Sequence, residues 1–151
     1  VSADGEWITV RGAEPGSGTY TATDIETAAY PGLATDLQPP TGVLLTQARG
    51  SSTVHETIYE DRLEWLTDLG LMGARAEIRD AHHAVITGPV RLQGAEVKVG
   101  VLRAGASLIL GALAAEGRST IHGVHHVRRG YEGIESKLLD LGAGIEEEPE
   151  A

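Results

Sequence analysis

Gly50-Ser51-Ser52-Thr53-Val54-His55 decides the fold, because the stretch returns 67 positions later, from position 50 to position 117, as Gly117-Arg118-Ser119-Thr120-Ile121-His122. A fixed internal period of this length indicates one supersecondary unit used twice, with each copy covering the apolar face of its neighbour. We place the first unit at residues 17–88 and the second at residues 89–151, after the end of a preceding hairpin at residues 1–16. The sequence thus predicts one domain made of two repeats.

The same offset also relates polar residues in the two units. It carries Asp36 onto Arg103 and Arg62 onto Arg129. Equivalent positions of stacked repeats lie on the same edge of a repeat protein. We therefore expect these four side chains to converge on one shared edge.

Composition limits the class of protein. The chain has 151 residues, 41% of them hydrophobic, which is typical of a globular domain with a packed core. It has no cysteine, which excludes disulfides and thiolate metal sites. A net charge of −10 repels nucleic acid. No apolar run approaches the ~20 residues of a membrane span, and the N-terminus lacks a basic-then-apolar leader. We expect a cytoplasmic protein with neither nucleic acid nor membrane as partner.

The first unit reads as β-α-β-α-β-β. A hairpin precedes it, with its second strand at Glu6–Val10 after the turn residues Asp4-Gly5. Asp36 is expected to cap the first helix, which tolerates proline in its first turn. The elements expected after the hairpin are a strand at Thr19–Ile25, a helix from Asp36 with Val43, Leu44, Leu45 and Ala48 buried before Gly50, a strand at Thr53–Tyr59, a helix with Leu63, Leu66, Leu69 and Met72 buried before Gly73, and a closing hairpin of Ala76–Ile78 with Ala84–Ile86.

The second unit repeats this order. Its first helix is apolar on nearly all sides and should be buried. The expected elements are a strand at Ala95–Val101, the apolar helix at Leu102–Glu116 ended by Gly117, a strand at Ser119–Val124, a helix at Gly130–Leu141 ended by Gly142, and a last strand near Ile145.

Four motifs in this order resemble the C-terminal portion of the UDP-N-acetylglucosamine 1-carboxyvinyltransferase (MurA) family of enolpyruvyl transferases. The motifs are Tyr30-Pro31-Gly32-Leu33-Ala34-Thr35-Asp36-Leu37-Gln38, His55-Glu56-Thr57-Ile58-Tyr59-Glu60-Asp61-Arg62, Leu102-Arg103-Ala104 and His126-Val127-Arg128-Arg129-Gly130-Tyr131-Glu132. The resemblance implies an α/β fold of α+β repeats, the inverse α/β barrel-like fold in which each domain holds three β-α-β-α-β-β units. This chain matches two units and is incomplete relative to such a domain.

The resemblance also implies a reaction. In the family, the enolpyruvyl group of phosphoenolpyruvate moves to the 3-hydroxyl of UDP-N-acetylglucosamine in peptidoglycan precursor synthesis. The aspartate at the position of Asp36 contacts that hydroxyl and is the candidate base, a role suited to a carboxylate. From the residues alone, Asp36 has a second interpretation as a helix N-cap, and both roles are compatible.

Further site residues follow from the resemblance. Arg62, Arg103 and Arg129 match arginines that face the phosphate-bearing part of the cleft, where guanidinium groups hold a phosphate and stabilise charge. We assign catalysis to Asp36 and Arg129, and substrate binding to all four. Ile58 and Tyr59 match the segment that lies against the nucleotide sugar, with strand core as the competing interpretation.

The chain departs from the family at two acidic positions, which here are Val101 and Arg128. Losing a carboxylate beside Arg103 removes a partner that orients the arginine or carries a proton. Nothing in the chain matches the family's other domain with its catalytic loop, so we expect no activity from the chain alone. His122, His125 and His126 are interpreted as ordinary surface histidines, and we expect no metal and no cofactor.

Two hypotheses remain open at this point. In the first, the chain is part of an enolpyruvyl transferase whose site is completed by the missing N-terminal part of the enzyme. In the second, it is a stand-alone non-catalytic or engineered repeat module of the same fold. Either way, two units of a three-unit ring expose the faces where the third unit packs, so we also expect self-association.

Overall fold

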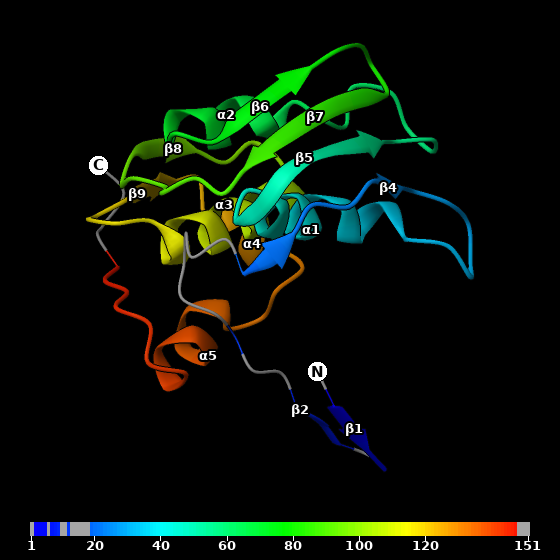
Figure 1. Cartoon of the computed structure of the whole chain (residues 1–151). Helices are drawn as coiled ribbons and strands as arrows, with labels where there is room; N and C mark the ends of the chain where they lie inside the picture. Colours follow the sequence, from blue (N-terminus) through cyan, green and yellow to red (C-terminus); the bar gives the residue numbers. More distant parts are fainter. Residues whose placement is uncertain (1, 6, 10–11, 13–18, 148–151) are drawn as a thin grey trace.

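A twisted sheet with helices on one face forms the body of the molecule (Figure 1). The computed structural model describes residues 2–5, 7–9, 12 and 19–147. The central strand is β5 (Ala48–His55), and it pairs antiparallel with β7 (His83–Gly88), with Val54 opposite Ala84. The remaining strands are β3 (Tyr20–Thr21) and β4 (Ile25–Glu26), which run parallel to β5, and β6 (Arg75–Ile78), which runs antiparallel to β7.

Buried and more exposed residues alternate along β5 and β7, and this alternation shows which face of the sheet is covered. Ser52 and Val54 on β5 and Ala84 and Ile86 on β7 are buried, whereas the residues between them are exposed or half-buried. Side chains two apart on a strand share a face, so this pattern places one face against the helices and the other in solvent.

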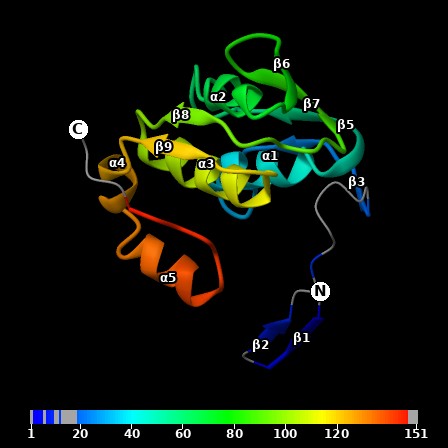
Figure 2. The same ribbon diagram turned by 90° about the vertical axis from the view of Figure 1, so that its left-hand side faces the viewer.

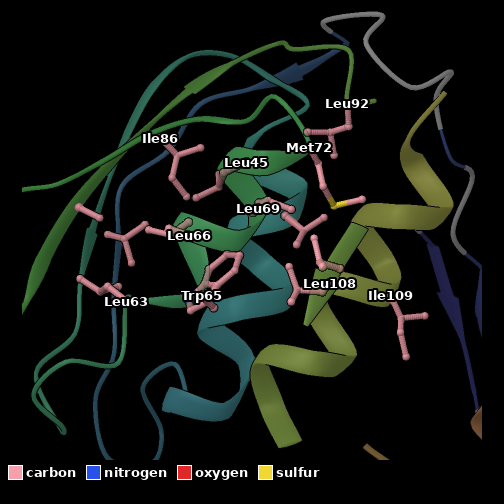
Figure 3. Packing of buried hydrophobic residues seen from close by; sticks show 14 of the residues in the cluster. Leu45, Leu63, Trp65, Leu66, Leu69, Met72, Ile86, Leu92, Leu108 and Ile109 are labelled. Atoms are coloured by element: carbon pink, nitrogen blue, oxygen red, sulfur yellow. The ribbon is translucent and has the colours of Figure 1, made fainter. Parts of the chain in front are cut away.

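Three helices cover the buried face. A 3₁₀ turn, η1 (Thr35–Leu37), leads into α1 (Gln38–Leu45), whose first turn admits Pro39 and Pro40 because its amides have no intrahelical partner. The other two are α2 (Trp65–Leu71) and α3 (Leu102–Ala114), and α3 lies beside α1 (Figure 2). The apolar side chains of α1, α2 and α3 meet beneath the sheet (Figure 3). They include Leu45, Trp65, Leu66, Leu69 and Leu108, and they pack with Met72 at the end of α2 and with Ile86 of β7.

The second unit supplies a smaller two-stranded sheet. Strands β8 (Glu96–Lys98) and β9 (Thr120–His122) run parallel and flank α3 in sequence. They are followed by α4 (His125–Arg128) and α5 (Ile134–Asp140). One backbone hydrogen bond has a counterpart in each predicted unit. The His55 carbonyl accepts from the Thr27 amide at 2.9 Å, and the His122 carbonyl accepts from the Val99 amide at 2.8 Å.

The chain begins with a hairpin of β1 (Ser2–Asp4) and β2 (Trp7–Thr9), which lies apart from the body in both views (Figures 1 and 2). Its Trp7 side chain is 79% exposed, in contrast to Trp65 at 4%. Among the residues described, no helix combines the length and apolar character needed to cross a bilayer.

Most predicted elements are confirmed. The hairpin strand near Trp7, α2, the β6–β7 hairpin, α3 and β9 lie where expected. The four apolar residues predicted for the second helix are all buried, although Leu63 lies just before α2 and Met72 just after it. Gly73 adopts the predicted left-handed conformation after α2, with φ of 87°.

Several predicted boundaries are wrong. The strand expected at Thr19–Ile25 is split into β3 and β4, because Asp24 turns its carboxylate onto the Thr53 amide at 2.6 Å instead of continuing the ladder. The strand expected at Thr53–Tyr59 begins at Ala48, so Ala48 is a strand residue and α1 ends at Leu45. The helix expected at Gly130–Leu141 is shorter, because it begins as α5 at Ile134 after Gly133, which is left-handed with φ of 59°. A separate short helix, α4 (His125–Arg128), precedes that range. Residues 143–147, which the structure describes, form no strand near Ile145.

Burial of the helices also differs in part from expectation. Leu44 on α1 is 49% exposed, and Leu110 and Leu113 on α3 are each 42% exposed. The α3 helix is therefore buried on one side only, and Leu108 and Ile109 are among the residues on that side.

Candidate functional site

Asp36 lies at the centre of the site, in the 3₁₀ turn before α1. Its carboxylate oxygen Oδ1 accepts from Arg62 Nη1 at 3.2 Å and also contacts Arg103 Nε. The Asp36 side chain is 53% exposed. Within the described part of the chain, no hydrogen bond or ion pair engages the second oxygen, Oδ2. One oxygen is thus anchored by two guanidinium groups, and the other carries no such bond within the described residues.

The predicted role of Asp36 as a helix N-cap is wrong. The N-cap position of α1 is Leu37, and no side chain bonds to the free amides there. Asp36 lies inside the η1 turn, which continues directly into α1, so it is not at the start of that helix. Its carboxylate also contacts two guanidinium groups in place of helix amides.

Arg62 is held from three sides. Besides the ion pair with Asp36, its Nη1 donates to Thr35 Oγ1 at 2.8 Å. Its guanidinium carbon lies 4.4 Å from the centre of the Tyr59 ring, a cation–π geometry. Arg103 reaches the same carboxylate from the first turn of α3. Two segments distant in sequence therefore place positive charge on either side of Asp36, an arrangement able to bind an anion.

Ile58 and Tyr59 lie beyond the end of β5, in the loop that leads to Arg62. They are 43% and 52% exposed, so the competing interpretation of strand core is wrong. Strand pairing stops at His55, and the next residue, Glu56, draws both backbone amides to its carboxylate at 2.9 and 3.3 Å. Both side chains are consequently available at the surface near Arg62.

Among the described residues, Arg129 makes no bond to the other three. It follows α4 with an exposed side chain, and within the described ranges its guanidinium makes no hydrogen bond or ion pair. The expected convergence of four polar side chains is confirmed for Asp36, Arg62 and Arg103. For Arg129 it stays a prediction, although the next residue, Gly130, lies against Leu102, the neighbour of Arg103. In the second unit the pair equivalent to Asp36 and Arg62 is Arg103 and Arg129, two cations that repel.

Glu56 is a buried charged residue to which the sequence motifs assigned no role. Its side chain is fully buried, and it accepts from the hydroxyl groups of Thr27 at 2.9 Å and Thr35 at 2.8 Å. The alternation of β5 contains the signal that reveals it. Ser52 and Val54 are buried, and Glu56 is the next residue on that face.

The two positions that depart from the family have different surroundings. Val101 is the N-cap of α3 in extended conformation, 63% exposed and without a side-chain cap. Arg128 bonds to Glu135 and Glu147, each at 2.6 Å. Those bonds raise the pKa of Arg128. Burial opposes ionisation of Glu135, yet hydrogen bonds from its backbone amide and Arg128 leave the pKa of Glu135 below its usual range. Arg128 therefore links α4 to α5.

The histidines form no metal centre in the described part of the chain, where no group of three or more histidine, cysteine or acidic side chains is placed to hold an ion. His122 Nε2 lies 2.8 Å from Glu96, and the rings of His125 and His126 lie 4.1 Å apart. Two surface hollows of about 320 Å³ each lie elsewhere, one beside Asp61 and Ile78 and the other beside Asp24 and His83. Asp36 lines neither hollow and lies on an open surface.

Comparison with known proteins identifies the family. The sequence profile of EPSP synthase (3-phosphoshikimate 1-carboxyvinyltransferase) matches residues 1–138. The chain is 49% identical over 122 residues to UDP-N-acetylglucosamine 1-carboxyvinyltransferase 2 of Listeria monocytogenes, covering 81% of this chain and 29% of that protein. The corresponding protein of Geobacillus kaustophilus is 46% identical over 130 residues, covering 86% of this chain and 30% of its own length. This chain thus spans less than a third of these curated relatives.

A solved structure gives the same result for the fold. The enolpyruvyl transferase NikO from Streptomyces tendae superposes with a TM-score of 0.76 at 31% sequence identity, over 83% of this chain and 29% of that one. The mixed α/β arrangement is therefore part of the fold of this family. The resemblance seen in the sequence motifs is confirmed, and the chain belongs to the EPSP synthase (3-phosphoshikimate 1-carboxyvinyltransferase) family of enolpyruvyl transferases.

Proposed function

We propose that this chain is part of an enolpyruvyl transferase that acts on UDP-N-acetylglucosamine and phosphoenolpyruvate in peptidoglycan precursor synthesis in the cytoplasm. The support is its similarity to relatives that are named as UDP-N-acetylglucosamine 1-carboxyvinyltransferases. The chain covers 29% of the length of one such relative, so the proposal assigns it part of a site and no activity alone. The rest of the site comes from the missing part of the enzyme.

The observation that carries the proposal is the carboxylate of Asp36 between two arginines. In the proposed reaction the sugar hydroxyl oxygen bonds to the enol carbon, and the bond from that carbon to the phosphate oxygen breaks. The hydroxyl proton passes to Asp36 and from there to the departing phosphate, so that inorganic phosphate leaves and the carboxylate is restored. A base must lie within hydrogen-bonding reach of the proton it removes, and Oδ2 of Asp36 is the oxygen not occupied by Arg62 or Arg103.

The arginines have the complementary task. Arg62 and Arg103 are forked donors suited to a phosphate oxygen. In this proposal they bind phosphate groups of the ligands at the cleft, and Ile58 and Tyr59 lie against the nucleotide sugar. Arg129, which makes no bond to the other three within the described residues, takes part once the remaining polypeptide or the ligand is bound. The two repeat units at 17–88 and 89–151 serve to bring Arg103 to Asp36.

Calorimetric titration with UDP-N-acetylglucosamine tests the proposal, with phosphoenolpyruvate as second ligand. We expect saturable binding that weakens at least about tenfold in Asp36→Ala, a loss of roughly 1.4 kcal/mol. Asp140→Ala is the matched control, because Asp140 is an exposed aspartate in α5 with no hydrogen bond or ion pair within the described residues.

A complementation assay completes the test. The chain is mixed with the remaining part of a related transferase, and release of inorganic phosphate is followed. Activity that depends on Asp36 supports the proposal. Absence of transfer from a folded, complete mixture contradicts it and leaves the stand-alone, non-catalytic module as the better description.

A further inference from the structure

We propose that Glu56 is a positioning residue for this half-site, and that its buried carboxylate fixes Arg62 through the hydroxyl of Thr35. The consequence for ligand binding rests on the proposed function. The geometric part of the inference does not, and it has its own readout below.

The carboxylate of Glu56 is fixed by four donors. Oε1 accepts from Thr27 Oγ1 at 2.9 Å and from the amides of Ile58 and Tyr59 at 2.9 and 3.3 Å, and Oε2 accepts from Thr35 Oγ1 at 2.8 Å. The residue is fully buried. A charge out of contact with water is tolerated only when such bonds replace its hydration, so Glu56 has one strongly preferred position.

The direction of each hydrogen bond then follows from chemistry. A carboxylate only accepts and a guanidinium only donates, whereas a hydroxyl does one of each. Thr35 must therefore give its proton to Glu56 Oε2 and offer its lone pair to Arg62 Nη1, which lies 2.8 Å away. The same Nη1 donates to Asp36 Oδ1 at 3.2 Å. Glu56 is thus connected to Asp36 through two intermediate side chains, with every donor and acceptor assigned.

Glu56 also controls the other face of Arg62. By binding the amides of Ile58 and Tyr59, it shapes the loop after β5. This loop places the Tyr59 ring 4.4 Å from the Arg62 guanidinium carbon. One buried carboxylate therefore sets both the hydrogen-bonded edge and the stacked face of the arginine.

Two threonines supply a matched test. Thr35→Val and Thr27→Val each replace one hydroxyl that donates to Glu56 by a methyl group of nearly the same shape. Thr35 alone bonds to Arg62, whereas Thr27 binds the backbone of Thr57. Thr35→Ser restores the hydroxyl and serves as the rescue variant. Glu56→Gln is a further variant, because its amide nitrogen donates to Thr35 where the carboxylate accepted.

The readouts are the NMR signal of the Arg62 side-chain Nε–H group, assigned with Arg62→Lys, and the affinity for UDP-N-acetylglucosamine. In Thr35→Val we expect the Arg62 signal to move and broaden, and the affinity to fall at least about tenfold. Thr35→Ser is expected to recover both. Thr27→Val is expected to be less stable and to move the Arg62 signal less than Thr35→Val does, because Thr27 makes no bond to Arg62 and can reach it only through the loop that Glu56 Oε1 binds. In folded protein its affinity is expected to fall less than that of Thr35→Val.

The outcomes separate the two proposals. If Thr35→Val leaves the Arg62 signal unchanged, or if Thr27→Val alters it equally, Glu56 is only a structural residue and the inference is overturned. If the unmodified chain binds no nucleotide sugar even with the rest of the enzyme, the proposed function fails, and the Arg62 signal alone decides the positioning role.

Discussion

Asp36 pairs with guanidinium groups from two distant parts of the chain, yet these pairs contribute little to stability. The side chains of Asp36, Arg62 and Arg103 are 53%, 23% and 44% exposed. Ion pairs this open to solvent are worth about 0–1 kcal/mol each. The cluster is thus better suited to binding than to holding the fold together, and variants at Asp36 are informative about ligands without a large loss of stability.

Asp80 has the opposite character, because it holds the turn between β6 and β7. Its Oδ1 accepts from the amides of His82 and His83, both at 2.8 Å, and lies 2.9 Å from His83 Nδ1. The hydrogen bond from the His82 amide is the main cause that lowers the pKa of Asp80, followed by the bond to the His83 side chain. A carboxyl with a lowered pKa stabilises the folded state above its ordinary pKa of about 3.9. The stabilisation is lost as the pH falls through the lower, folded value.

We therefore predict that Asp80→Asn is less stable than the unmodified chain at pH 7, and that the difference shrinks on acidification below about pH 4. Urea denaturation between pH 7 and pH 2.5 measures it, with Asp140→Asn as control. A stability difference that stays constant over this range contradicts the assigned role of the Asp80 charge.

The site was predicted in part from its residues. The repeat offset correctly brought Asp36, Arg62 and Arg103 together. It could not show that Arg129 makes no bond to them within the described residues, since an offset gives the equivalent place within each unit and carries no information about the sign of the charges that meet there. Glu56 was missed because the motifs drew attention to their exposed members, whereas its importance comes from burial by segments as distant as Thr27.

At the scale of elements, α3 begins without a cap. Val101 has the extended conformation of an N-cap residue, with φ of −137° and ψ of 145°, and its side chain cannot accept a hydrogen bond. An aspartate in this conformation accepts from the free amides of the first turn and interacts well with the helix dipole. The resemblance described in the sequence analysis implies an acidic residue at this position, which would supply both a cap and a neighbour for Arg103.

We predict that Val101→Asp stabilises the chain by about 1 kcal/mol, as measured by urea denaturation. Val101→Leu is the control that keeps the position apolar, and Val101→Asn tests capping without charge. If the aspartate and leucine variants are equally stable, an acidic cap does not stabilise α3 and the prediction is wrong.

The elements with a strong apolar periodicity, such as α2, were predicted correctly. The strand segments made of polar residues, such as the first half of β5, were missed. Leu63, Leu66, Leu69 and Met72 predict α2 because one face of a helix is buried. The first half of β5 has no such signal, since Arg49, Gly50 and Ser51 are exposed and its pairing with β7 comes from residues over 30 positions away. Long-range pairing of this kind is invisible to a local pattern.

The molecule as a whole leaves apolar helix surface uncovered. Leu44 on α1 and Leu110 and Leu113 on α3 are between 42% and 49% exposed. These leucines lie on two helices that contact each other, and exposed apolar surface on neighbouring elements is typical of interfaces. The chain's net charge of −10 opposes contact between copies, and salt screens that repulsion. We therefore propose that isolated chains associate through this helix surface when the rest of the enzyme is absent.

The prediction is concentration-dependent association that strengthens with salt, measured by light scattering. Leu110→Glu combined with Leu113→Glu is expected to give monomers. Leu71→Glu on α2, at a leucine that is 62% exposed, is the matched control and should not alter association. A monodisperse monomer of the unmodified chain at high concentration contradicts the proposal.

Because the hairpin lies apart from the body, the tryptophan fluorescence of the chain has two separable sources. The chain has two tryptophans, and one indole is on the exposed hairpin while the other is inside the core. Their emission is a sum of a quencher-accessible component from Trp7 and a shielded component from Trp65. Collapse of the core alters the second component alone, and Trp7→Phe leaves an emission spectrum that belongs to the core beneath the sheet.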